Sequence, residues 1–448
     1  MVENLSSKIG FSAMKITPEQ DLAKIPLGGY YVRYATGVHD DIYVRTIYMA
    51  ANEEILIIAC DLLALFGKFI KRMKTEIHRY TGVKDTNILI CALHDHSAPD
   101  TLGLEGFRGL VKYTLRGDWF PRIERTIVRS AIDAKKSAKP RKIGVQSEFL
   151  GQHEKLVINR RHPRQEMKYN LSTFKVSEDE GICASIINYA CHGTTLNREN
   201  RLISAEYPGY LIRRVEKALE PHFSMYLNGP CGDINPYLFP ERWDFEKIDF
   251  ESYLSGDYAK FNALCSFKHT ERIGERLAAH ALELLGTTAT REIENIQVVT
   301  QQIELPVSYT YPKMSFRDRL GIWVKNGLLK LLGAYNRSNI NYFSYLHKNG
   351  NLVVQTDLQL ILINKEILII AVPAELFSEL GEELIKKSPV KHTIIVELAN
   401  DAIGYVFPLK ECEFGGYEVF GLASFAGITA GTFLKNKIVK LFRQLNLD

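Results

Sequence analysis

The sequence predicts an α/β protein with a layered, mixed β-sheet core and flanking helices. Short apolar runs rich in β-branched residues alternate with longer amphipathic stretches, a pattern typical of sheets covered by helices. One apolar run is divided in two by Asn364-Lys365, which indicates a tight hairpin. A hairpin pairs its strands antiparallel, whereas strand–helix–strand units pair them parallel, so we expect the sheet to be mixed.

Each element follows from its local pattern. The strand segments are short and almost free of charge, as strands buried on both faces are. The helical segments carry apolar residues three and four positions apart, which places them on one face. The expected strands span residues 54–61, 87–93, 183–190, 224–228, 358–371 and 393–399. The expected helices span residues 68–80, 121–136, 205–219, 270–285, 375–387 and 430–445.

The composition is that of an ordinary globular protein. The chain has 448 residues, of which 46% are hydrophobic and 24% charged, and it is long enough to bury a large core. We expect a single domain over residues 1–448. The formal net charge of +4 is small for this length and no nucleic-acid-reading motif occurs, so nucleic acid is not an expected partner.

No targeting or membrane-spanning segment is evident. The first residues lack the apolar region and cleavage site of a secretory signal, and no run reaches the roughly 18 apolar residues that spanning a bilayer requires. We therefore expect a cytoplasmic protein. The seven cysteines show no Cys-x-x-Cys spacing, and most lie in strand-like runs, so reduced and buried thiols are expected.

One basic segment is open to two interpretations. Residues 316–337 mix lysine and arginine with bulky apolar residues at helical spacing. This pattern fits a lid or an interfacial helix, within residues 310–348, that makes peripheral contact with a membrane. The more common origin of such a pattern is a surface helix that packs its apolar face onto the core.

Histidines follow two of the expected strands directly. His94 and His96 come after residues 87–93, and His192 comes after residues 183–190. Functional sites of α/β proteins form where strands end. Side chains two positions apart on a strand share a face, so we expect His94 and His96 to belong to one site.

This pattern favours a hydrolytic zinc site, which needs about three ligands from histidine, aspartate or glutamate and an open position for water. Glu375 could complete such a set, because it follows an apolar strand and opens an expected helix. A glutamate in a first helical turn is also favoured by the helix dipole alone. The turn that contains Asp233 and Asn235 is a further candidate, since its glycines let the backbone approach a ligand.

Six motifs, taken in order, resemble the neutral/alkaline non-lysosomal ceramidase family. The resemblance runs from about Gly10 to about Gly421. The motifs are His94-Asp-His96-Ser-Ala-Pro, Ile-Asn-Arg160, Asn-Tyr-Ala-Cys-His192, Asn-Gly-Pro-Cys-Gly-Asp233-Ile-Asn235-Pro, Val-Pro-Ala-Glu375 and Ile-Gly-Tyr405-Val.

The resemblance implies a ceramidase-like catalytic domain that is a zinc-dependent amidohydrolase. Its substrate would be ceramide or another small-molecule or N-acyl lipid amide. By the family's motifs, Zn²⁺ is held by His94, His192 and Glu375, with Tyr405 at the metal. The residues that contact the substrate or the reacting carbonyl are then His96, Arg160 and Tyr417, and Tyr417 lies twelve residues beyond Tyr405, as in the family.

The chain also departs from the family pattern. Family members carry Gly-Asp-x-Ser-Pro-Asn, with a catalytic role assigned to the serine, where this chain has Asn235. An asparagine cannot act as a nucleophile but can donate to an oxyanion, so metal-activated water is the expected nucleophile. Thr-Thr is replaced by Phe407-Pro408, and Gly-Pro-Gly-Gly by residues 98–101. We expect no C-terminal immunoglobulin-like domain.

Roles for the remaining residues follow from this mechanism. His96 would carry a proton to the leaving nitrogen, and Arg160, Tyr417 and Asn235 would donate to the oxyanion. Asp233 would accept a proton from a ligand histidine.

Two alternatives remain open. One is a metal-free cysteine hydrolase that uses Cys231, or Cys191 beside His192. The other is a non-catalytic lipid-binding protein, which the basic segment 316–337 and the missing serine would favour.

Overall fold

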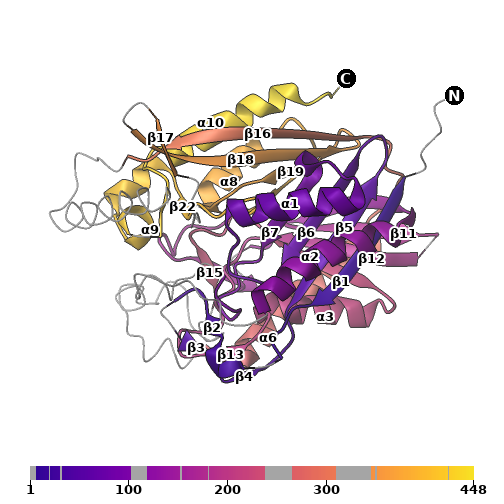
Figure 1. The fold of residues 1–448 in the computed structure, drawn as a ribbon, viewed down its shortest axis with the longest axis horizontal. Coiled ribbons are helices and arrows are strands. Elements are labelled where there is room, and N and C mark those ends of the chain that lie inside the picture. Colours follow the sequence, from indigo (N-terminus) through magenta and orange to yellow (C-terminus); the bar gives the residue numbers. More distant parts are fainter. Residues whose placement is uncertain are drawn as a thin grey trace.

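Three β-sheets share one hydrophobic core in the computed structural model, and helices cover their outer faces (Figure 1). The structure describes residues 7–19, 21–30, 33–101, 119–151, 154–179, 181–237, 265–308, 345–348, 351–421 and 423–447. Each of the three sheets contains both antiparallel and parallel pairs. The predicted α/β class with mixed sheets is therefore confirmed.

The first sheet has the strand order β7-β6-β5-β1-β8 and is buried on both faces. Along β6, Ile55 and Ile57 face the core that the three sheets share, while Leu56 and Ile58 face helices α1 and α2. This double burial explains why the strand is a continuous apolar run. The elements are β1 (Lys8–Lys15), β5 (Tyr43–Ala50), β6 (Glu54–Cys60), β7 (Ile88–Ala92), β8 (Lys139–Pro140), α1 (Gly67–Thr81) and α2 (Trp119–Lys136).

The second sheet has the order β14-β12-β11-β9, with β12 and β14 parallel. The amphipathic helices α3 and α6 pack on each other and against this sheet. The buried residues of α6 recur every three or four positions, as the sequence predicts, whereas the first turn of α3 is buried on all sides. The elements are β9 (Lys142–Glu148), β11 (Leu171–Glu178), β12 (Gly181–Tyr189), β14 (Phe223–Asn228), α3 (Glu206–Ala218) and α6 (Phe267–Thr287).

The third sheet has the order β16-β18-β19-β21, and β17 pairs with β18. The expected hairpin is confirmed: β18 and β19 are antiparallel, and Asn364 and Lys365 in their turn have φ angles of 53° and 58°. Helices α8 and α10 pack on this sheet. The elements are β16 (Ile296–Pro306), β17 (Tyr345–Lys348), β18 (Asn351–Ile363), β19 (Ile367–Ala371), β21 (His392–Val396), α8 (Ser378–Lys386) and α10 (Ala430–Leu441).

Short elements connect these layers, and two short strand pairs, β10–β15 and β20–β22, build the candidate site. The short elements are β2 (Pro26–Leu27), β3 (Arg33–Tyr34), β4 (Gly37–Val38), β10 (Val157–Asn159), β13 (Leu202–Ile203), β15 (Ile234–Pro236), β20 (Glu375–Leu376), β22 (Tyr405–Val406), α9 (Tyr417–Phe420) and the 3₁₀ turns η1 (Leu22–Lys24), η2 (Asp85–Asn87), η6 (Leu409–Glu413) and η7 (Phe442–Gln444).

Several expected boundaries were wrong, including two near the candidate site. The helix expected from residue 375 begins at Ser378, because Glu375 lies in β20, which pairs with β22. The strand expected over residues 393–399 ends at Val396, because Leu398 and Asn400 adopt positive φ angles that no strand accommodates. The basic segment 316–337, with most of the proposed lid, lies outside the described residues. No helix in the described ranges has the length and apolar character needed to cross a membrane.

Asn400 ties the first sheet to the third. Its main-chain N–H donates to the Ile90 carbonyl at 2.8 Å, and its side-chain oxygen accepts from the Ile90 N–H at 3.2 Å. Its amide nitrogen donates to Gln359 Oε1 on β18 at 2.9 Å. A buried asparagine in a left-handed conformation thus completes the ladder of β7 beside the candidate site.

We predict that Asn400→Ala lowers the free energy of unfolding by about 2–4 kcal/mol, because it leaves buried polar groups unpaired and places alanine at φ +67°. Denaturant unfolding monitored by circular dichroism measures this change. The exposed Asn436→Ala on α10 is the control and should stay within about 0.5 kcal/mol of wild type. Equal stability of the two variants would contradict the proposed tie.

Candidate metal centre

Segments that follow one strand of each sheet meet at a single place. His94 and His96 follow β7, His192 follows β12, and Glu375 follows β19. The main chain holds two of these segments together, because Asp95 pairs with Gly193 and the His96 N–H donates to the Gly193 carbonyl at 3.2 Å. Backbone pairing rather than side-chain contact therefore brings the histidines together.

His94 and His96 do belong to one site, but not by strand alternation. Strand β7 ends at Ala92, and His94 has a φ angle of +61°, so the chain turns there. After this turn the two rings meet edge to face, with their Nε2 atoms 3.2 Å apart. The rings of His94 and His96 lie together as expected, but a turn at His94 brings them together, not the alternation of side chains along a strand.

Main-chain carbonyls orient two of the rings. His94 Nδ1 lies 3.2 Å from the Leu63 carbonyl, and His192 Nδ1 lies 2.6 Å from the Cys231 carbonyl and 3.1 Å from that of Ile234. A carbonyl accepts only, so each Nδ1 carries the proton and each Nε2 keeps its lone pair. Both lone pairs are then available to a metal ion.

These lone pairs face a buried carboxylate. Glu375 Oε2 lies 3.2 Å from His94 Nε2 and 3.4 Å from His192 Nε2, and no donor among the described residues satisfies this oxygen. Burial lowers the pKa of His192 to about 4, which keeps it neutral. Burial also lowers the pKa of His94, but Glu375 outweighs this and the net shift is upward. The arrangement therefore requires a cation, either a proton on His94 or a metal ion.

The donor set fits a metal. His94, His96 and His192 offer ring nitrogens that all lie within 4.8 Å of one another, and all three residues are buried. Imidazole nitrogen and carboxylate oxygen are the usual ligands of catalytic zinc, and ligand histidines usually donate their second N–H to a carbonyl or carboxylate. Either the three histidines, or His94 and His192 with Glu375, could hold the ion.

Tyr405 reaches this centre through strand pairing. The parallel pair β20–β22 places Tyr405 directly beside Glu375, and the Tyr405 ring stacks 6.5 Å from that of His192. Burial raises the pKa of Tyr405 well above its usual value, so the phenol stays neutral. The Tyr417 ring lies 5.8 Å from that of Tyr405 and is 57% exposed, so it forms part of the outer rim.

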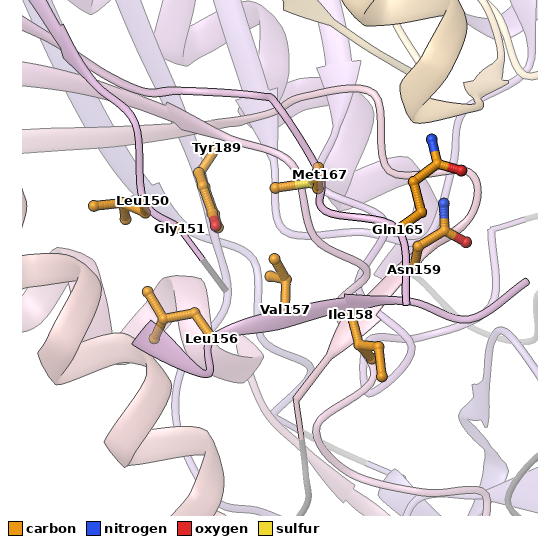
Figure 2. A pocket seen from close by; sticks show the side chains of 9 residues that line it. All are labelled: Leu150, Gly151, Leu156, Val157, Ile158, Asn159, Gln165, Met167 and Tyr189. Carbon is orange, nitrogen blue, oxygen red and sulfur yellow. The ribbon is translucent and has the colours of Figure 1, made fainter. Parts of the chain in front are cut away.

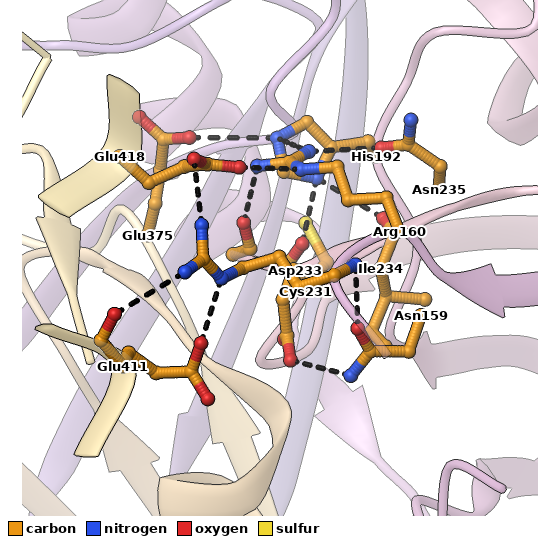
Figure 3. A network of polar contacts seen from close by, with 12 residues as sticks. Asn159, Arg160, His192, Cys231, Asp233, Ile234, Asn235, Glu375, Glu411 and Glu418 are labelled. Carbon is orange, nitrogen blue, oxygen red and sulfur yellow. Dashed lines mark hydrogen bonds and ion pairs between the residues drawn. The ribbon is translucent and has the colours of Figure 1, made fainter. Parts of the chain in front are cut away.

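Arg160 spans the site from β10 (Figure 3). Its Nε donates to Glu418 Oε1 at 3.0 Å, and its Nη1 donates to Asn235 Oδ1 at 2.9 Å and lies 3.5 Å from His192 Nε2. The guanidinium also lies over the rings of Tyr405 and Tyr417, 5.5 and 5.7 Å from their centroids. The structure therefore brings Arg160, Asn235 and Tyr417 to one side of the histidines.

Sequence reasoning missed the ion pairs that hold this side together. Arg161 Nε donates to Glu411 Oε2 at 2.7 Å, and its Nη1 donates to Glu418 Oε2 at 3.1 Å. Both glutamates are buried and lie about 250 positions away in the chain. No local pattern could have indicated them, although an Arg-Arg pair directly after a strand was a visible signal.

Asp233 does not accept a proton from a ligand histidine. Its carboxylate accepts from the Ser378 N–H at 2.7 Å, from Ser378 Oγ at 3.0 Å and from Asn159 Nδ2 at 2.7 Å. The main-chain carbonyls of Leu63, Cys231 and Ile234 accept the hydrogen bonds from the histidines instead. Asp233 instead joins the start of α8 to Asn159 at the end of β10, directly before Arg160.

The two candidate thiols are poorly placed to act as nucleophiles. Cys231 Sγ donates to Glu397 Oε1 at 2.8 Å, and Cys191 Sγ donates to the His192 carbonyl at 3.4 Å. Both residues are fully buried, and burial raises the pKa of each thiol well above its usual value. A buried, protonated thiol is inert, which argues against the cysteine hydrolase.

A small cavity lies beside β10 (Figure 2). The space open to a water-sized molecule is about 10 Å³, room for about one water, and no histidine lines it. The Tyr189 hydroxyl is buried there without a hydrogen-bond partner among the described residues. Its lining residues are Leu150, Gly151, Leu156, Val157, Ile158, Asn159, Gln165, Met167 and Tyr189. This cavity is not part of the metal centre.

Fold and site together define the class: an α/β protein with a candidate metal centre of histidine and glutamate where three mixed sheets meet. The family model of the neutral/alkaline non-lysosomal ceramidase N-terminal domain matches residues 8–315, and the chain belongs to this family. The resemblance seen in the sequence is thus confirmed. No curated protein matches the chain.

Two solved structures have a similar fold. Neutral ceramidase from Pseudomonas aeruginosa has a TM-score of 0.74 at 16% identity, over 100% of this chain and 76% of that one. A ceramidase complexed with C2 has a TM-score of 0.75 at 17% identity, over 99% and 76%. At these identities the comparison shows a shared fold.

The geometry predicts about one divalent metal ion per purified chain and its loss in His192→Ala and Glu375→Ala, because each substitution removes a converging ligand atom. Elemental analysis measures the metal content. His96→Ala should keep the ion if His96 carries protons and lose it if His96 is a ligand. His222→Ala is the control. His222 lies directly before the first residue of β14, at the end of the strand away from the metal centre, and its ring forms a hydrogen bond with Ser185. A wild-type protein that cannot be loaded with metal would contradict the site.

Proposed function

We propose that this chain is a zinc-dependent hydrolase that cleaves the amide bond of ceramide or a similar N-acyl lipid. The observation that carries the proposal is the convergence of His94 Nε2 and His192 Nε2 on Glu375 Oε2, which has no hydrogen-bond donor of its own among the described residues. Membership of the ceramidase family supports amide hydrolysis as the reaction. The similar fold of a ceramidase complexed with C2 supports a lipid amide as the substrate.

Bound zinc would supply the activation of water as a nucleophile near neutral pH. His94, His192 and Glu375 would hold the ion, with Tyr405 beside it. His96 would carry a proton to the leaving nitrogen, since its Nε2 lies 3.2 Å from that of His94 and its ring packs 4.8 Å from Tyr30.

Arg160, Asn235 and Tyr417 would stabilise the oxyanion. Arg160 holds Asn235 Oδ1, so the Asn235 amide nitrogen is turned away from the guanidinium and can donate to the substrate. Asn235 thus has a donor role where the family motif carries serine. The ion pair with Glu418 holds the Arg160 guanidinium in place before the substrate binds, as transition-state stabilisation requires.

We predict that the purified protein releases fatty acid from short-chain ceramides, that a zinc chelator abolishes the release, and that added zinc restores it. Chromatographic quantification of fatty acid and free amine measures the reaction. Turnover that resists chelation but stops on thiol alkylation would support the cysteine hydrolase instead. Binding to ceramide-containing vesicles without turnover of any amide or ester would support the lipid-binding protein.

We predict that Asn235→Ala lowers kcat about 10²–10³-fold, as loss of one oxyanion donor does, with little change in metal content. Steady-state kinetics on the same amide checks this outcome. Asn235→Ser keeps a smaller donor and should retain more activity than Asn235→Ala, and the exposed Asn436→Ala should match wild type. Full activity of Asn235→Ala would exclude the donor role.

A further inference from the structure

Glu397 is a fully buried carboxylate that the proposed mechanism does not use. It follows β21, and all its described hydrogen-bond partners are uncharged. Oε2 accepts from the Cys231 N–H at 3.0 Å, and Oε1 accepts from Cys231 Sγ at 2.8 Å and Asn228 Nδ2 at 3.3 Å. Burying a carboxylate among uncharged donors is unfavourable, so its presence calls for an explanation.

Cys231 connects this carboxylate to the metal centre. Its N–H donates to Glu397, while its carbonyl accepts from His192 Nδ1 at 2.6 Å, as Figure 3 shows for the Cys231–His192 contact. The next residue, Gly232, donates its N–H to the Leu376 carbonyl at 2.8 Å, beside Glu375. The Cys231-Gly232 segment thus lies between Glu397 and two of the proposed ligands.

We infer that Glu397 is a positioning residue for the metal centre, which holds the Cys231 main chain against His192 and thereby sets the affinity for zinc. This inference rests on the proposed function, because it presupposes a metal at the histidines. Glu397 holds the main chain of Cys231, and the Cys231 carbonyl in turn orients the His192 ring. A ligand ring that is already oriented binds metal more tightly than a mobile ring.

The electrostatics do not oppose this geometry. Burial raises the pKa of Glu397 to about 8. The side chain therefore acts on Cys231 as a hydrogen-bond acceptor, and the uncharged amide of glutamine can take its place.

The test is the dissociation constant for zinc, measured by competition with a chromogenic chelator, on variants whose metal-free fold is checked by circular dichroism. Glu397→Leu removes both acceptors and is expected to weaken zinc binding about 10–100-fold. Glu397→Gln keeps an acceptor for the Cys231 N–H and should recover most of the affinity. Cys231→Ala keeps both main-chain groups and should stay within a few-fold of wild type.

Asp401→Ala is the matched control. Asp401 is a buried carboxylate of the same loop, but its partners are the Gly67 and Ala402 N–H groups. Its loss should lower stability and leave the zinc affinity within a few-fold of wild type. A purely structural role for Glu397 predicts the same result for Glu397→Leu, which would overturn the inference.

Glu397→Asp keeps the test decisive if the leucine variant fails to fold. Aspartate keeps the charge but draws the carboxylate back from the Cys231 N–H, so it should bind zinc more weakly than Glu397→Gln. Equal affinity of the two variants would overturn the positioning role. A wild-type protein that binds no zinc in the same titration would instead overturn the proposed function, and this inference with it.

Discussion

The candidate site depends on one electrostatic constraint: a buried carboxylate oxygen faces two imidazole nitrogens, and this arrangement requires a cation, either a proton on His94 or a metal ion. Glu375 Oε2 lies 3.2 and 3.4 Å from the Nε2 atoms of His94 and His192. The Leu63 and Cys231 carbonyls fix both tautomers, so the lone pairs cannot turn away. In a buried region such a cluster is strongly unfavourable without a cation. The surrounding fold is what keeps these three groups together.

Strands and turns that depend only on neighbouring residues could be predicted from the sequence. The strands before His94 and His192 are apolar on both faces because each is covered on both sides, and continuous apolar runs reveal this directly. The hairpin at Asn364 was visible because asparagine tolerates the positive φ angle that the turn requires. The ordered motifs then indicated which strand ends belong to one site.

Features that depend on distant segments could not be predicted. Glu375 reads as the start of a helix, and only its pairing with Tyr405, thirty positions later, makes it a strand residue that faces the histidines. The acceptors of the ligand N–H groups are main-chain carbonyls, which every residue carries and no sequence pattern marks. Asp233 was expected in that role because a carboxylate can be read from the sequence and a carbonyl cannot.

Under the proposed mechanism, the reaction does not depend on the family serine, because Asn235 lies apart from the groups that would hold the metal. The histidines and Glu375 are held by backbone pairing and carbonyls, none of which involves residue 235. Asn235 contacts Arg160, whose guanidinium is held separately by Glu418. A change from serine at this position would therefore alter one proposed donor and leave the geometry of the histidines and Glu375 intact. Residue 235 would then affect how the carbonyl is held, while the activation of water would remain with the histidine–glutamate centre.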